Sequence, residues 1–172
     1  HESSGAGGKL FLNTTAAFAA DTGIWNNTAP TSSLVSTGSG INTANPFIAY
    51  CFAEIPGYSS IGSYTGNGST DGPFVYTGFK PAFVMIKVTS NAPTGWAIID
   101  NKRSNSFNPT DGLLQPDQSG AEGTTDKFDI LSNGFKVRTT WAGANGNGYT
   151  VTYMAFAENP FGGDGVAPAT AR

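Results

Sequence analysis

Two glutamates form the one pattern in this sequence that could support bond cleavage. Glu54 and Glu158 stand in matching contexts, each after an apolar run and two residues before a proline. A glycosidase requires two carboxyl groups about 5–10 Å apart around a sugar linkage. A structural role competes with this interpretation, because a carboxylate at a strand end accepts hydrogen bonds from turn N–H groups. We favour the structural role and predict that the chain is not an enzyme and has no catalytic residues.

Nucleophilic and metal-assisted chemistry lack the residues that they need. His1 is the only histidine, and a serine or cysteine nucleophile needs a base, usually a histidine, within hydrogen-bond reach. Cys51 is the only cysteine; it lies between two aromatic residues, and we interpret it as a buried core thiol. Phosphate-binding loops, zinc-protease helices and EF-hand loops have no counterpart here. We therefore expect no cofactor and no metal.

Two loops carry side chains suited to binding a ligand. Trp141 precedes a Gly/Asn-rich run that contains Asn145 and Asn147, and an exposed indole offers a face on which a sugar ring can stack. Asp100 and Arg103 concentrate charge after an apolar strand, which is consistent with a loop that binds a sugar or an anion. The alternatives are a tryptophan in the core and solvated surface charges of little energetic value.

The composition describes a neutral, hydroxyl-rich and amide-rich surface. Charged residues make up 12% of the 172 residues, and 23 glycines accompany abundant Ser, Thr and Asn. A formal net charge of −3 provides no basic face for a phosphate backbone, so nucleic acid is not an expected partner. Since no apolar run reaches the roughly 20 residues of a membrane span, we expect no membrane insertion.

Short strands must position these residues, because Gly, Pro or Asn interrupts every stretch long enough to show helical periodicity. We predict one helical turn at most, within Ala16–Asp21, and hairpins at Asn133-Gly134 and at Asn145–Gly148, where Asn and Gly accept positive φ. The predicted fold is an all-β antiparallel β-sandwich of jelly-roll or lectin-like type. The predicted strands are Lys9–Asn13, Ser33–Thr37, Phe47–Glu54, Ser59–Tyr64, Gly72–Thr77, Phe83–Thr89, Trp96–Asp100, Asp126–Ser132, Phe135–Thr139 and Tyr149–Glu158.

A repeat divides the chain. The run Phe52-Ala53-Glu54-Ile55-Pro56 recurs 104 positions later as Phe156-Ala157-Glu158-Asn159-Pro160, and each copy ends an apolar stretch. Repetition of one supersecondary unit usually means that neighbouring copies bury a shared face. The residues assigned to this structural repeat motif are Phe52, Glu54, Pro56, Phe156, Glu158 and Pro160.

The repeat predicts an internal duplication. Residues 1–56 are interpreted as the second half of a repeat unit, and residues 57–172 as a complete unit packed with it in one globular domain. In this interpretation Tyr50–Glu54 and Met154–Glu158 occupy equivalent central strands.

A resemblance to a known family is carried by the segments Tyr50–Tyr58, Ile61–Pro81, Phe83–Lys87, Trp96–Asp100, Leu131–Lys136 and Met154–Phe161. On these segments the sequence resembles an uncharacterised C-terminal domain family of tailed-bacteriophage virion proteins. The resemblance covers nearly the whole chain, but Val88 stands where the family usually has a basic residue. Units of this family are often tandem, and the protein often ends shortly after the last Pro-Phe, as this chain does. This implies a natural C-terminus here and a start within a longer polypeptide.

This resemblance implies a structural protein at the virion surface, as a tail-fibre, tail-tip or capsid-decoration module that acts in assembly and host-receptor attachment. The expected partners are other virion proteins and further copies of the chain, with a trimer as the typical fibre assembly. An alternative of another class is a carbohydrate-binding or glycan-depolymerising domain that recognises bacterial surface glycans.

Overall fold

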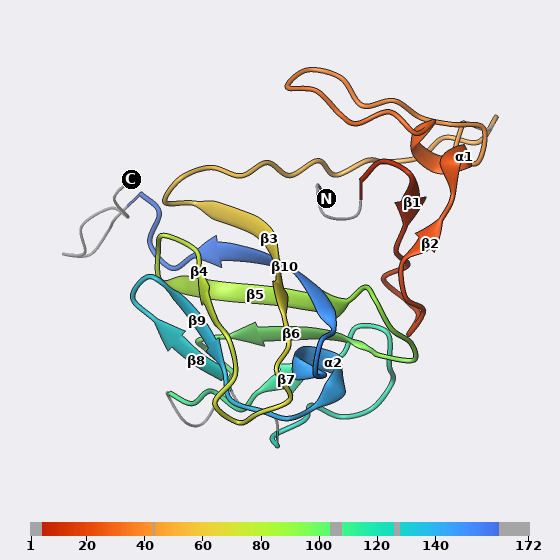
Figure 1. The fold of residues 1–172 in the computed structure, drawn as a ribbon. Helices are drawn as coiled ribbons and strands as arrows, with labels where there is room; N and C mark the ends of the chain where they lie inside the picture. The colour runs from red at the N-terminus through yellow and green to blue at the C-terminus, as the bar shows by residue number, and fades with distance from the viewer. Residues whose placement is uncertain (1–4, 43, 104–107, 126–127, 162–172) are drawn as a thin grey trace.

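Two antiparallel sheets dominate the computed structural model, which describes residues 5–42, 44–103, 108–125 and 128–161 (Figure 1). The five-stranded sheet has the order β3-β10-β5-β6-β7, and the three-stranded sheet has the order β4-β9-β8. Their strands are β3 (Ser59–Thr65), β4 (Phe74–Tyr76), β5 (Pro81–Val88), β6 (Trp96–Asp100), β7 (Leu113–Leu114), β8 (Phe128–Leu131), β9 (Gly134–Val137) and β10 (Thr150–Ala157).

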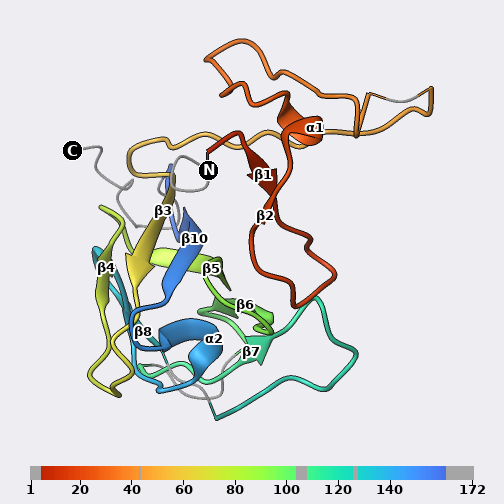
Figure 2. The same cartoon turned by 45° about the vertical axis from the view of Figure 1, so that its right-hand side comes forward.

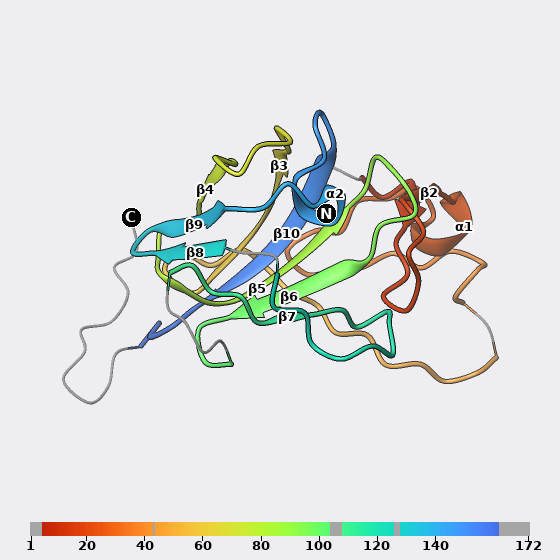
Figure 3. The same cartoon turned by 90° about the horizontal axis from the view of Figure 1, so that it is seen from below.

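The two sheets stack face to face with the core between them (Figure 3). Strand β10 shows why: Val151, Tyr153, Ala155 and Ala157 are buried, while the residues between them are half-exposed. This alternation places one face of each strand in the core and the other outside. The predicted all-β antiparallel sandwich is thus confirmed. The core cluster consists of Val75, Phe79, Val84, Ile86, Val88, Ala97, Ile99, Leu113, Phe128, Ile130, Phe135, Val137, Ala144, Val151, Tyr153, Ala155 and Ala157.

The predicted hairpin at Asn133-Gly134 is confirmed as the link between β8 and β9, with Leu131 paired to Gly134. Its backbone differs from the prediction, since neither Asn133 nor Gly134 has a φ in the left-handed region. Glycine is required at position 134 for another reason. A Cβ there would lie 2.1 Å from the carbonyl oxygen of Val75 on the neighbouring strand β4.

The predicted hairpin at Asn145–Gly148 is wrong. Instead of pairing with the preceding segment, β10 joins the five-stranded sheet between β3 and β5, while β9 belongs to the other sheet. The connection contains the helical turn α2 (Ala142–Asn145) and passes from one layer to the other. The Gly and Asn residues therefore predicted a change of chain direction correctly. Sheet pairing determined which strands the chain joins after it.

The seven strands predicted between residues 57 and 161 are confirmed, mostly with shorter bounds, and Trp96–Asp100 is confirmed as predicted. Residues 126 and 127 of the predicted strand Asp126–Ser132 lie outside the described part of the chain. The additional strand β7 is a two-residue edge strand paired with β6.

The predictions for residues 1–56 are largely wrong. Neither Ser33–Thr37 nor Phe47–Glu54 is a strand, and the predicted strand Lys9–Asn13 is reduced to β1 (Gly8–Lys9). Strand β1 pairs with β2 (Ala19–Ala20), which occupies the place of the predicted helical turn. The turn forms later as α1 (Thr22–Trp25), because the Asp21 carboxylate caps its first N–H groups by accepting from Gly23 N at 2.8 Å.

The expected equivalence of Tyr50–Glu54 with Met154–Glu158 is also wrong within this chain. Strand β10 is central in its sheet, whereas residues 44–56 are exposed and pair with no sheet except at Ile55, which bridges Ser59. An apolar run becomes a strand only where neighbouring strands accept its hydrogen bonds. The duplication and the division at residues 56/57 remain predictions, as claims about sequence units.

The amino-terminal segment forms an arm beside one end of the five-stranded sheet (Figure 2). Phe18 N donates to Thr89 O at 3.1 Å, and the Trp96 indole N–H donates to Phe11 O at 2.8 Å. Both helices among the described residues are single turns, too short to cross a membrane.

Candidate functional site

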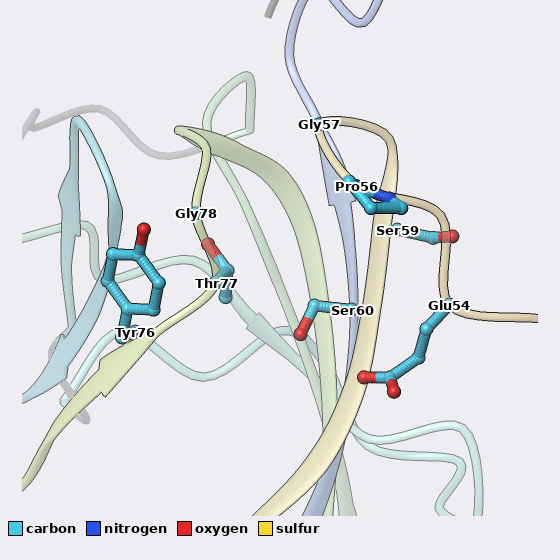
Figure 4. Close-up of a pocket in the computed structure, with 8 residues that line it drawn as sticks. All are labelled: Glu54, Pro56, Gly57, Ser59, Ser60, Tyr76, Thr77 and Gly78. Atoms are coloured by element: carbon cyan, nitrogen blue, oxygen red, sulfur yellow. The ribbon is translucent and has the colours of Figure 1, made fainter. Parts of the chain in front are cut away.

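A small pocket of about 240 Å³ lies where the segment leading into β3 faces the end of β4 (Figure 4). Two glycines shape its walls, because Gly57 and Gly78 have φ of 75° and 83°, a left-handed conformation that most residues avoid. The pocket is lined by Glu54, Pro56, Gly57, Ser59, Ser60, Tyr76, Thr77 and Gly78.

The pocket offers hydroxyl groups, one carboxylate and one aromatic ring. Glu54 Oε1 accepts a hydrogen bond from Ile61 N at 3.0 Å, and the Ser60 hydroxyl lies 3.1 Å from that of Tyr153. The Thr77 hydroxyl donates to Phe79 O at 2.7 Å. Tyr76 is 56% exposed, so its ring and hydroxyl face solvent. Such a set matches a small neutral polyol, which combines hydroxyl groups with an apolar ring face.

The second glutamate of the repeat, Glu158, does not line this pocket. Its carboxylate binds Lys80 Nζ at 2.6 Å and accepts from the Asn101 amide at 2.7 Å. The hydrogen bond from Lys80 outweighs burial and holds the pKa of Glu158 below its ordinary range. A glycosidase acid needs the opposite shift, because it must remain protonated near neutral pH. The contacts of Glu158 favour the structural role over acid catalysis.

Asn145, predicted to bind a ligand, is completely buried at the end of α2. Its Nδ2 donates to Asn67 Oδ1 at 3.1 Å, to Ser69 O at 2.7 Å and to Thr139 O at 2.9 Å. Its Oδ1 accepts from Asn67 N at 2.8 Å. The two N–H groups share these three acceptors, and the oxygen uses one lone pair. Because Asn145 is completely buried, it fastens three loop segments together and does not face a ligand.

The neighbours of Asn145 differ from it in exposure. Trp141 is half-buried, packs against the core cluster, and precedes the turn of α2. Asn147 is exposed. Of the three residues predicted around this loop, Asn147 and one side of Trp141 remain accessible to a ligand.

Asp100 and Arg103 are bonded mainly to each other. Asp100 Oδ1 accepts from Lys102 N at 2.8 Å and from Arg103 N at 2.9 Å, and the Arg103 guanidinium bridges Asp100, Glu122 and Ile98 O. Burial alone would raise the pKa of Asp100, but these hydrogen bonds and the guanidinium charge lower it overall. The pair therefore stabilises the end of β6.

The predicted ligand loops do not converge. Asp100 pairs with Phe83 at the start of β5, whereas the loop with Asn145 and Asn147 precedes Thr150, at the end of β10 that pairs near Val88. Because β5 runs the length of the sheet, the two predicted loops lie at opposite ends of it. They cannot form a single site for a small ligand.

The aromatic residues of the repeat motif meet on the outer face of the five-stranded sheet. The Phe156 ring lies 5.9 Å from Phe52, 6.0 Å from Tyr58 and 6.0 Å from Phe83, measured between centroids. Phe161 lies 5.7 Å from Tyr58. Pro56 lines the pocket and Pro160 is half-buried. The two copies of the motif thus touch through Phe52 and Phe156.

Cys51 corrects a prediction, because it is exposed and not in the core. Its apolar neighbours in sequence suggested a buried strand, but the strand does not form here. Among the described residues, no three His, Cys, Asp or Glu side chains come together as a metal site. His1 lies outside the described part of the chain.

Sequence reasoning missed Ser60 and Thr77 in the pocket, since nothing in the sequence places β4 opposite β3. Tyr76 could be considered as a stacking ring, but its place on a strand favoured the core, whereas the structure leaves it exposed. Sequence reasoning also missed Lys87, which is completely buried and donates through Nζ to Thr94 O. Burial lowers the pKa of Lys87, and the charge of Asp117 partly opposes this shift. A lysine within the apolar run of β5 was the available signal.

Comparison with known proteins gives a family. No curated protein and no solved structure matches this chain. One family model matches residues 1–160, which include all of the described strands and the pocket. The chain belongs to the family described as "Domain of unknown function (DUF7483)".

Proposed function

We propose that this chain is a non-enzymatic assembly module of a bacteriophage virion surface, in a tail fibre, a tail tip or a capsid decoration. The observation that carries the proposal is apolar surface on the outside of the sandwich. Its expected contacts are with other virion proteins and with further copies of the chain, and receptor attachment is a secondary role.

One part of this surface is a row of apolar side chains across the five-stranded sheet. Ile61, Met154, Met85, Ile98 and Leu114 are neighbours in register from β3 to β7. They point away from the core, and all remain partly or fully exposed. A continuous apolar band on an outer sheet face indicates contact with another protein surface.

The other part is the segment before β3, in which Ile48 and Tyr50 are 80% and 81% exposed. The resemblance to virion proteins supports a particle surface as the place where this apolar area is covered. The low charge and the hydroxyl-rich composition also suit a densely packed extracellular assembly.

Immunogold electron microscopy tests the proposal. An antibody against this chain should label intact particles of the phage that encodes it, and mass spectrometry of the purified particles should detect the chain. Particles with neither label nor peptide would refute the proposal. Light scattering on the purified chain measures self-association, for which we expect a trimer.

A second candidate function, carbohydrate binding, is favoured by the pocket between β3 and β4. Tyr76 provides an exposed ring beside Thr77 on one wall, and Ser60 and the Glu54 carboxylate lie on the opposite wall (Figure 4). Glu54 is the only acidic residue in this lining, which fits binding better than a two-carboxylate cleavage.

A bacterial glycan array tests this candidate, with Tyr76→Ala and the matched control Phe74→Ala. Phe74 is exposed on the same strand but does not line the pocket. We expect Tyr76→Ala alone to weaken binding by about tenfold, as loss of one stacking ring does. A wild-type chain that binds no glycan, or equal losses in both variants, would exclude the pocket as a glycan site.

A further inference from the structure

Residues 46–53 form an extended segment without a sheet. The sequence from Phe47 to Ala53 contains no charged residue, yet every residue from 46 to 53 is exposed. Among the described residues, no backbone-to-backbone hydrogen bond joins this segment to another. Figures 1 and 2 show it running outside both sheets before the chain turns into β3. An uncharged, unpaired strand edge is a surface that binds another strand.

The same chain contains a paired counterpart of this segment. At the repeat distance, residues 46–53 correspond to residues 150–157, which are β10 in full. Strand β10 is hydrogen-bonded on both edges, to β3 and to β5. In the counterpart register, Phe47 takes the place of buried Val151, and Cys51 takes the place of buried Ala155.

A second correspondence precedes the strand. In α2, Ala144 N and Asn145 N both donate to Trp141 O, at 3.0 and 2.8 Å. Before residue 46, Ile41 N and Asn42 N both donate to Gly38 O, at 3.2 and 2.9 Å. The two turns read Gly143-Ala144-Asn145 and Gly40-Ile41-Asn42. The same turn, ending in the same residue, thus leads into both segments. The two turns lie 103 residues apart, so the link from turn to strand is one residue shorter before residue 46.

The asparagines that end these turns differ only in their surroundings. Asn145 is buried because Asn67 and Ser69, in the loop after β3, supply two of its partners. Asn42 is exposed. Asn42 therefore matches Asn145 in its turn, but no loop among the described residues covers it as the loop after β3 covers Asn145.

We propose that residues 36–53 are the closing half of a second unit of this fold, and that their partner is an opening half with the sequence pattern of residues 57–104. The segment 46–53 inserts as the central strand between that partner's counterparts of β3 and β5. Phe47, Ala49, Cys51 and Ala53 then face its core, and Asn42 binds the counterpart loop after β3.

The contact between units is already present. Phe52, which would point outward from the completed sheet as Phe156 does, packs against Phe156 of the existing unit. Two completed units would therefore meet through the two aromatic residues of the motif. This proposal goes beyond the virion assignment and does not depend on it, because its test uses the purified chain alone.

Cys51 provides a direct readout, since it is the only cysteine and is exposed. We would place a second copy of residues 57–104 in front of His1, because 57–104 followed by 1–56 reproduces the span 57–160. The added residues contain no cysteine. Reaction with a chromogenic thiol reagent should be at least about tenfold slower in this extended chain than in the original, because burial protects a thiol.

Two controls define the outcome. The added copy carrying Val84→Pro and Ile86→Pro cannot pair as a strand, so Cys51 should react at the original rate. In the unbroken extended chain, Asn42→Ala should restore part of the reactivity, whereas the same change in the original chain should have no effect.

Three results would overturn the proposal. One is equal Cys51 reactivity in the original and extended chains, whether or not the added half folds. Another is protection that survives the two prolines. The third is protection of the original chain that rises with its own concentration, which would identify a second copy of the chain as the partner.

Discussion

Residues 57–161 and residues 5–56 each contain one copy of the motif, but they differ in how far their apolar side chains are buried. Every member of the core cluster lies between Val75 and Ala157. In contrast, most large apolar side chains between residues 44 and 56 are exposed. Phe156 lies on a strand with two neighbours, whereas Phe52 lies on a segment with none. The comparison teaches that a strand sequence becomes a strand only when a neighbouring strand pairs with it.

The two regions should differ most in how much stability is lost when a phenylalanine is truncated. Phe135→Ala should lower the free energy of unfolding by about 3–5 kcal/mol, because the buried ring packs against Tyr64 and Tyr153 and would leave a cavity. Phe47→Ala, in the exposed segment, should change it by less than about 0.5 kcal/mol. Urea unfolding followed by fluorescence measures both. Equal losses would mean that the segment 46–53 is packed in solution.

The next difference concerns the two asparagines. Asn145→Ala should cost about 3 kcal/mol, since it removes a completely buried amide that bonds to Asn67, Ser69 and Thr139. The matched variant Asn42→Ala should leave the unfolding midpoint unchanged. The comparison would fail if Asn42→Ala were as destabilising as Asn145→Ala.

Two crowded glycines give a smaller effect. A Cβ at Gly134 would lie 2.1 Å from Val75 O, and a Cβ at Gly38 would lie 2.3 Å from Gly23 O. Gly134→Ala should cost about 2 kcal/mol, because the two strands must move apart within a packed sheet. Gly38→Ala should cost less than about 0.5 kcal/mol of global stability, because its surroundings lie outside the core. Thermal unfolding of both variants checks this, and a reversed order would contradict it.

The smallest expected effect is the pH dependence contributed by Glu158. Its pKa is lower in the folded protein than its ordinary value of 4.5, so the unfolded chain binds more protons as the solution is acidified. The stabilisation is present above that value and is lost as the pH falls through the lower, folded value. Glu158→Gln should therefore flatten the loss of stability below pH 4.5.

Lys80→Met is the matched variant for this measurement, because Lys80 is the main cause of the shift. Unfolding midpoints between pH 3 and pH 7 should converge toward low pH for the wild type and both variants. Parallel profiles would show that the ion pair does not contribute to stability.

Local sequence patterns predicted the sandwich well within residues 57–161. The strand Trp96–Asp100 and the hairpin at Asn133-Gly134 followed from apolar runs and turn residues that lie next to each other. The pocket was not predicted as a site: Glu54 and Pro56 were predicted as residues of the structural motif. Tyr76 and Thr77 lie at the end of β4 and just after it, in the other sheet. Their approach depends on how the two sheets stack, which no local pattern encodes.

By itself, the sequence determined that the chain builds short antiparallel strands, because Gly, Pro and Asn end every apolar run before a helix can form. Only the tertiary structure decided which of these apolar runs become paired strands. It placed Thr150–Ala157 between two strands and left residues 46–53 exposed, although both lead into the same motif. The physical reason is that strand hydrogen bonds and sheet burial come from neighbours distant in sequence, and these are present for one copy and absent for the other.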